Sequence, residues 1–281
     1  SALVALNRAI DLAPDVYVYH TLRAAVYEGY RRQEQGPREP DCDRSSGSTP
    51  YEVCLIRVGY LNLGEAAKQR PFDWRPRLNL ADTGLKLALL ERDSNMANEA
   101  ISLYREVAHL DPQASWHWEW LAAAHINVGQ YEAALDPLEK SLALLDGKPK
   151  SAFSRLLQGM AYLELDEPTT ALGSFDEAIR LNPNLADAYT NRGATYNSLG
   201  QYQRAVRDLD RAIILNPEMA IAYNNRGNSY GNLDQFERAI EDYDEAIRLD
   251  PRFALAYSNR ALAYTYIGRD EDARADVERG T

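Results

Sequence analysis

Three arginines have a spacing that indicates a specific chemistry. They recur every 34 residues, and each precedes an aspartate by 16 residues. A guanidinium presents its N–H groups in a fork that matches the two oxygens of a carboxylate. We therefore predict structural Arg–Asp pairs between helices, although the arginines could instead form a basic clamp for a partner's carboxylate. The pairs are Arg192 with Asp208, Arg226 with Asp242, and Arg260 with Asp276.

Asparagines recur with the same period, in the residues next to these arginines. A carboxamide both donates and accepts hydrogen bonds, so a row of carboxamides matches the polar groups of an extended peptide. We predict a partner-binding groove on this basis. The alternative is that asparagine is simply common on a polar helix or bonds to its neighbours. The predicted groove residues are Asn191, Asn224, Asn225, Asn228, Asn232 and Asn259.

The segment SWHWEW contains two further candidates for contact with a ligand. Trp116 and Trp120 are four residues apart and therefore share one face of a helix. Exposed aromatic rings at a groove indicate contact with a sugar, a peptide or a protein. The alternative is that both rings pack against the preceding region, which contains Trp74.

The two cysteines, Cys42 and Cys54, flank a stretch rich in proline, glycine and serine. We predict a disulfide that pins this insertion, at about residues 33–50, and hence an extracytoplasmic or secreted location. Two unrelated thiols and a cytoplasmic location are the alternative. Asp41 and Asp43 could hold calcium, but their segment lacks the spacing of an EF-hand.

The sequence gives no signal of an enzyme. It has no glycine-rich phosphate loop, no Gly-x-Ser-x-Gly and no His-Glu-x-x-His, and its four histidines lack the spacing of metal ligands. We expect no catalytic residue, no metal and no cofactor, with calcium as the one open possibility. A net charge of −11 argues against a nucleic-acid partner. No apolar run approaches the roughly 18 residues of a membrane span.

The elements that must position these residues follow from an internal repeat. Pro183, Pro217 and Pro251 are 34 residues apart and close the similar phrases AIRLNP, AIILNP and AIRLDP. A tyrosine-rich helix, a turn and a second amphipathic helix precede each proline. This pattern resembles the tetratricopeptide repeat, with bulky residues at position 4, small residues at 8, 20 and 27, and proline at 32. The repeats begin near Ala81, Ser115, Ala152, Ala186, Ala220 and Ala254.

The resemblance implies an all-α fold, a right-handed tetratricopeptide superhelical solenoid of about 15 antiparallel helices. We expect residues 1–80 to form an irregular, repeat-like region and residues 81–281 to form the regular array. Within the irregular region, we expect the phrase QRPFDWRP to be a non-helical link. His125, at position 11 of its repeat, is expected to replace a core tyrosine.

The resemblance also implies a non-enzymatic scaffold for protein interaction, with the first helix of each repeat lining a concave groove. Two modes of action follow. Uncapped repeat ends could stack head to tail into a ring or filament, or the asparagine groove could bind a peptide. A weaker resemblance is to the soluble C-terminal repeat region of bacterial O-antigen-ligase-type membrane proteins. It implies an accessory domain in which Trp116 and Trp120 contact a saccharide.

Overall fold

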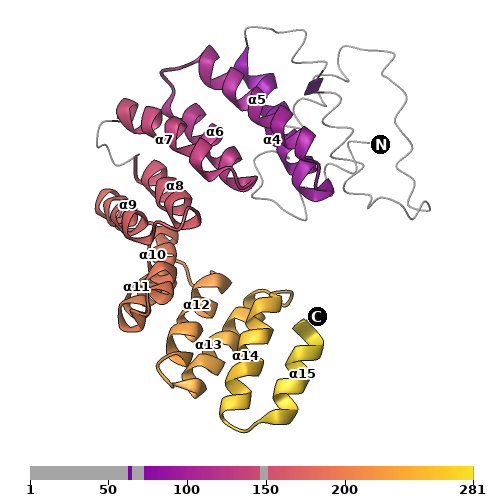
Figure 1. The fold of residues 1–281 in the computed structure, drawn as a ribbon, viewed down its shortest axis with the longest axis vertical. Helices are drawn as coiled ribbons and strands as arrows, with labels where there is room; N and C mark the ends of the chain where they lie inside the picture. Colours follow the sequence, from indigo (N-terminus) through magenta and orange to yellow (C-terminus); the bar gives the residue numbers. More distant parts are fainter. Residues whose placement is uncertain (1–62, 65–72, 146–150, 281) are drawn as a thin grey trace, which may run out of the picture. The chain divides into compact units, whose positions relative to one another are not determined.

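The computed structural model describes residues 63–64, 73–145 and 151–280, and these residues form helices without any strand (Figure 1). The all-α class therefore agrees with the sequence prediction. The expected count of about 15 helices concerns the whole chain, whereas the described ranges contain twelve, α4 to α15. The predicted disulfide, the insertion at residues 33–50 and the calcium ligands Asp41 and Asp43 lie outside the described ranges. The chain divides into two compact units, residues 1–144 and 145–281.

The described helices of the first unit form two consecutive antiparallel hairpins. Helix α4 begins earlier than expected, because the end of the phrase QRPFDWRP belongs to it rather than to a link. Asp73 caps this helix by accepting a hydrogen bond from the backbone N–H of Arg75 at 3.1 Å. Pro76 lies in the first helical turn, where its missing N–H removes no helical bond. The helices are α4 (Trp74–Glu91), α5 (Ser94–Leu110), α6 (Ser115–Asn127) and α7 (Tyr131–Leu145).

The second unit consists of four hairpins, and each helix packs against the next one. The first helices of neighbouring repeats also contact one another, as α10 does with α8 and α12. The four first helices are α8 (Ser151–Glu164), α10 (Ala186–Ser198), α12 (Ala220–Gly231) and α14 (Ala254–Tyr266). The four second helices are α9 (Pro168–Leu181), α11 (Tyr202–Leu215), α13 (Phe236–Leu249) and α15 (Asp270–Gly280).

Two kinds of turn separate the helices of the second unit. Within a repeat, the turn needs a residue with positive φ, which is Gly200 at 70° in one repeat and Asp234 at 59° in the next. Between repeats, the phrase Asn-Pro, or Asp-Pro after α13, ends the second helix. Asn216 is extended because Pro217 follows it, and its side chain accepts a hydrogen bond from the N–H of Glu218 at 3.2 Å. The recurring prolines therefore mark the repeat boundaries for a physical reason.

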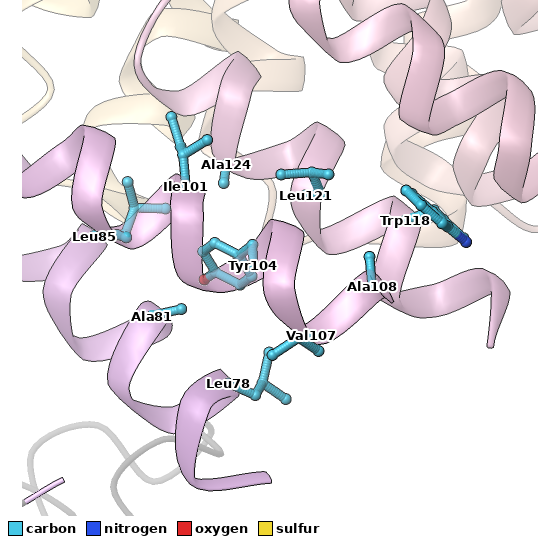
Figure 2. Packing of buried hydrophobic residues seen from close by; sticks show 11 residues of the cluster. Leu78, Ala81, Leu85, Ile101, Tyr104, Val107, Ala108, Trp118, Leu121 and Ala124 are labelled. Atoms are coloured by element: carbon cyan, nitrogen blue, oxygen red, sulfur yellow. The ribbon is translucent and has the colours of Figure 1, made fainter. Parts of the chain in front are cut away.

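The core of the first unit lies between α4, α5 and α6. Figure 2 shows Leu78, Leu85, Tyr104 and Leu121 converging from these three helices into one buried cluster. Because each helix presents only one apolar face, no single hairpin can bury its side chains alone.

Close contact between the two helices of a repeat is most evident at glycine in the second unit. A Cβ atom added to Gly227 would lie 2.6 Å from the ring of Tyr243, and one added to Gly193 would lie 2.8 Å from Leu209. The Tyr243 ring has little freedom to move, because it is buried and its hydroxyl donates to Asn228 at 2.8 Å. A glycine at position 8 thus lets α12 and α13 approach closely.

We predict that Gly227→Ala destabilises the second unit by about 1–2 kcal/mol, because the added methyl group overpacks the contact with Tyr243. Gly173→Ala is the matched control. Gly173 is also inside a helix, but an added Cβ meets no atom within 4 Å. It should stabilise by about 0.5–1 kcal/mol through helix propensity alone. Urea unfolding followed by circular dichroism measures both changes, and equal stabilisation by the two substitutions would contradict the packing argument.

Candidate functional site

Each of the three predicted arginines forms a bidentate pair with its aspartate across the two helices of one repeat. In the central repeat, Nε and Nη2 of Arg226 donate to the two carboxylate oxygens of Asp242 at 2.9 and 2.6 Å. The other two pairs have both distances at 2.7 Å. The 16-residue spacing in the sequence thus corresponds to a direct contact between a first and a second helix.

A second aspartate, which the sequence analysis missed, completes each site. The remaining nitrogen of Arg226, Nη1, donates to Asp210 of the preceding repeat at 2.6 Å. The signal was present in the sequence, because this aspartate lies 16 residues before the arginine. We refer to the three arginines and six aspartates as the Arg–Asp ladder. Its members are Asp176, Arg192 and Asp208; Asp210, Arg226 and Asp242; and Asp244, Arg260 and Asp276.

The ladder is partly buried, and this burial affects both the hydrogen bonding of its carboxylates and the pKa of its arginines. Asp242 is buried, whereas Asp210 is half exposed, so the inner carboxylate depends on the guanidinium for its hydrogen bonds. Burial alone would lower the pKa of Arg226, but the hydrogen bonds and charge of Asp242, and then of Asp210, outweigh it and raise that pKa. The arginine stays charged, and all three of its guanidinium nitrogens are occupied. These contacts correspond to the structural interpretation of the arginines rather than to an open basic clamp.

The first repeat of the second unit has a neutral version of the same contact. Gln158 and Ser174 occupy the positions of the arginine and its aspartate, and the Ser174 hydroxyl donates to Gln158 Oε1 at 3.4 Å. In the first unit, Leu87 and Leu103 hold the same two positions. Charged, polar and apolar pairs therefore occur at equivalent positions. This agrees with the expectation that a buried ion pair stabilises a protein little more than an apolar pair does.

The predicted asparagine groove divides into buried and accessible members. Asn224 is completely buried, so the prediction that it faces a ligand is wrong. Its side chain links two repeats instead, because Asn224 Oδ1 accepts a hydrogen bond from Asn259 Nδ2 at 2.9 Å. Asn197 similarly joins α10 to α12 by donating to the backbone carbonyl of Asn225 at 2.8 Å. The alternative, that asparagines bond to their neighbours, thus accounts for part of the pattern.

Other asparagines retain polar groups that no described hydrogen bond uses. Asn225 accepts a long bond of 3.4 Å from Asn224, and its own Nδ2 donates to no group in the described ranges. Asn191 and Asn259 use their Nδ2 atoms, but within the described ranges their Oδ1 atoms accept no hydrogen bond. Asn228 accepts from Tyr243, and Asn232 donates to the backbone carbonyl of Asn228 on the same helix. We call the half-exposed Asn191, Asn225 and Asn259 the asparagine surface.

Trp116 and Trp120 lie in an aromatic cluster of the first unit. Their ring centres are 4.5 Å apart, and Trp74 of helix α4 packs edge-on against Trp116 at 5.0 Å. Both rings are half buried against the core of the first unit. This arrangement corresponds to the packing alternative rather than to an open platform for a sugar.

Two buried histidines accompany these rings on α6. Burial lowers the pKa of His117 and that of His125, so both are neutral near neutral pH. His117 donates from Nδ1 to the backbone carbonyl of Asp111 at 3.2 Å, while its buried Nε2 has no hydrogen-bond partner among the described residues. His125 is buried at the position where other repeats carry tyrosine, and Nδ1 bonds to Gln130 Oε1 at 2.8 Å.

The described residues contain no cluster of three or more histidine, cysteine, aspartate or glutamate side chains that could hold a metal ion. Of the described helices, none combines the length and apolar character needed to cross a bilayer.

Comparison with known proteins identifies the kind of repeat. The family model described as tetratricopeptide repeat matches residues 186–219 and 220–253. No curated protein sequence matches the chain. Among solved structures, a crystal structure of MamA protein is 25% identical, covers 59% of this chain and 89% of its own, and has a TM-score of 0.50.

Two further structures are similar in fold. MamA from residue 41 to its end, from Desulfovibrio magneticus RS-1, is 22% identical with a TM-score of 0.52, covering 59% of this chain and 92% of that one. A chain of the APC/C hetero-tetramer Cut9–Hcn1 is 17% identical with a TM-score of 0.66, covering 99% of this chain and 48% of that one. None of these likenesses is to an O-antigen-ligase-type protein, so that resemblance stays a prediction.

The ladder generates a testable prediction about stability. Arg226→Leu should lower the free energy of unfolding by about 2–3 kcal/mol, because it leaves the buried Asp242 carboxylate without its partner. The double variant Arg226→Leu/Asp242→Leu should recover to within about 1 kcal/mol of the original protein. The chain already carries two leucines, Leu87 and Leu103, at the equivalent positions of the first unit. Urea unfolding of both variants decides the matter, and a double variant no more stable than the single one would show that the charged pair itself is required.

Proposed function

Because this chain is a tetratricopeptide repeat protein, we propose that it is a non-enzymatic scaffold that binds an extended segment of a partner protein along the first helices of its second unit. The absence of a catalytic motif from the sequence is consistent with this role. Repeat arrays of this kind present extended surfaces on which such segments can lie.

The observation that carries the proposal is the chemistry of the asparagine surface. Nδ2 of Asn225 and Oδ1 of Asn259 make no hydrogen bond with the residues that the structure describes. The first can donate to a peptide carbonyl, and the second can accept from a peptide N–H. These groups lie on neighbouring first helices, α12 and α14, so they can contact successive parts of one extended chain.

Exposed apolar side chains accompany these amides. Ile221 lies four residues before Asn225, and Leu255 lies four residues before Asn259, so each shares a helix face with its asparagine. Leu262 follows Asn259 by three residues and is 57% exposed. A partner segment with alternating apolar side chains could bury these residues while its main chain bonds to the amides.

We expect peptides selected from a random display library against the full chain to depend on these residues. Asn225→Ala should weaken binding about fivefold, because it removes one main-chain hydrogen bond worth about 1 kcal/mol. Leu262→Ser should weaken it by a similar factor through lost apolar contact. Fluorescence anisotropy of a labelled peptide measures both.

The control is Asn184→Ala, an exposed asparagine in the turn between α9 and α10. This substitution should leave the affinity unchanged. Selection of no peptide at all, or of peptides that bind the Asn225 and Leu262 variants as tightly as the original chain, would contradict the proposed groove.

Head-to-tail self-assembly is a second candidate, and the exposure of α15 favours it. Position 24 is buried in the three preceding repeats, where it is Phe175, Leu209 and Tyr243, but its counterpart on α15, Val277, is 55% exposed. In the preceding repeats, the second helix that carries this position also packs against the first helix of the next repeat. A second copy could supply such a helix, which would give a ring or an open filament.

If this face mediates assembly, the average mass measured by light scattering should rise with protein concentration. Val277→Asp should abolish the rise, because a charge cannot be buried in the contact without a partner. Ile214→Asp is the matched control, since Ile214 is 71% exposed on α11, away from position 24. A constant monomer mass at every concentration, or equal assembly by the Val277 variant, would refute this candidate.

A further inference from the structure

A cavity in the first unit occupies the place that the Arg–Asp ladder fills in the second unit. It has a volume of about 170 Å³ and lies between α5, α6 and α7. Trp118 and Leu121, both buried in the core, form its apolar wall. The cavity is bounded by two second helices and only one first helix, so it is separate from the surfaces proposed above for peptide binding and self-assembly.

The repeat register explains why the space is open. In the ladder, an arginine of a first helix lies between an aspartate 16 residues earlier and another 16 residues later. The equivalent residues here are Leu121 in the centre, Arg105 before it and Pro137 after it. The leucine and the proline cannot form an ion pair, and the position that carries a carboxylate in the ladder carries a guanidinium.

Arg105 is consequently without an acidic partner. Its side chain is exposed, lines the cavity, and makes no hydrogen bond or ion pair with any residue in the described ranges. By contrast, the guanidinium of each ladder arginine contacts two carboxylates. An unpaired arginine beside an apolar wall is a ready site for a carboxylate from another molecule.

Among the other lining residues, one positive and one negative side chain neutralise each other. Lys140 lies 4.8 Å above the ring of Trp118 and pairs with Asp136 at 2.7 Å. His109 packs edge-on against Trp118 at 5.7 Å, and His125 is a further lining residue. Asp136 is the single carboxylate among the lining residues. Arg105 therefore gives the cavity its net positive charge, in a chain whose net charge is −11.

We infer that this cavity binds an acidic residue of a partner protein, with the carboxylate on Arg105 and the adjoining apolar part of the segment against Trp118 and Leu121. The partner thus replaces the aspartate that the repeat lacks. An arginine–carboxylate contact at a half-open site supplies orientation as well as affinity. Lys140 can follow the bound carboxylate without losing its contact with the Trp118 ring.

The test uses the full chain labelled with 5-fluorotryptophan, whose four fluorine resonances report on Trp74, Trp116, Trp118 and Trp120. A Trp118→Phe variant assigns the resonance that belongs to the cavity. The probe is the blocked tetrapeptide acetyl-Ala-Leu-Glu-Ala-amide, and its glutamine counterpart and inorganic phosphate serve as comparisons. We expect the glutamate peptide to shift the Trp118 resonance, and the glutamine peptide to bind about tenfold more weakly.

Arg105→Gln should weaken the glutamate peptide about tenfold, whereas Arg211→Gln, an exposed arginine on α11, should have no effect. Four results would overturn the inference. They are no Trp118 shift at about 10 mM peptide, which suffices to detect a Kd of about 1 mM; equal binding of the glutamine peptide; unchanged binding by the Arg105 variant; and phosphate binding as tightly as the peptide, which would indicate a general anion site. Because the asparagine surface plays no part in this measurement, failure here leaves the proposed peptide groove untouched.

Discussion

Close approach of the two helices in each repeat is the constraint on which the rest of the second unit depends. The backbone of α12 can lie against the ring of Tyr243 only because Gly227 has no Cβ atom, and Gly193 allows the same contact with Leu209. With the backbones this close, a polar side chain between the helices has no room for a hydrating water molecule. Any charged side chain at this contact must therefore find its partner within the contact itself.

In three of the repeats, the Arg–Asp ladder supplies these partners, and the close packing of the helices explains its arrangement. A first helix lies between its own second helix and that of the preceding repeat, so Arg192 on α10 reaches one aspartate on each side. The inner carboxylate is buried and the outer one is half exposed, and together they give the Arg192 guanidinium three acceptor oxygens without isolating a charge. The ladder thereby ties neighbouring repeats together as well as the two helices of each repeat.

The sequence predicts the structure best where two residues recur together with the period of the repeat, because such a pair indicates a direct contact. The fold class and the pairs of Arg192, Arg226 and Arg260 are of this kind. The outer aspartates were not predicted, although each lies 16 residues before its arginine, because they belong to the preceding repeat. The burial of Asn224 was not predicted, because asparagine is a residue type that is mostly exposed in folded proteins. Helix α4 also begins before the expected repeat, since a capping aspartate and an early proline resemble an irregular link in sequence.

The equivalent contact in the first unit shows how a repeat scaffold can acquire a binding site without changing its fold. Leu121 and Pro137 remove the charges that would seal the space, and Arg105 reverses the charge at its edge. Trp118 and Leu121 are buried in the core of the unit and also line the open cavity. The complete Arg–Asp ladder connects neighbouring repeats of the second unit. Where the carboxylates are missing, in the first unit, the equivalent space is open to a partner. The same location in the repeat therefore holds helices together in the second unit and receives a partner in the first. The difference lies in the side chains of Arg105, Leu121 and Pro137.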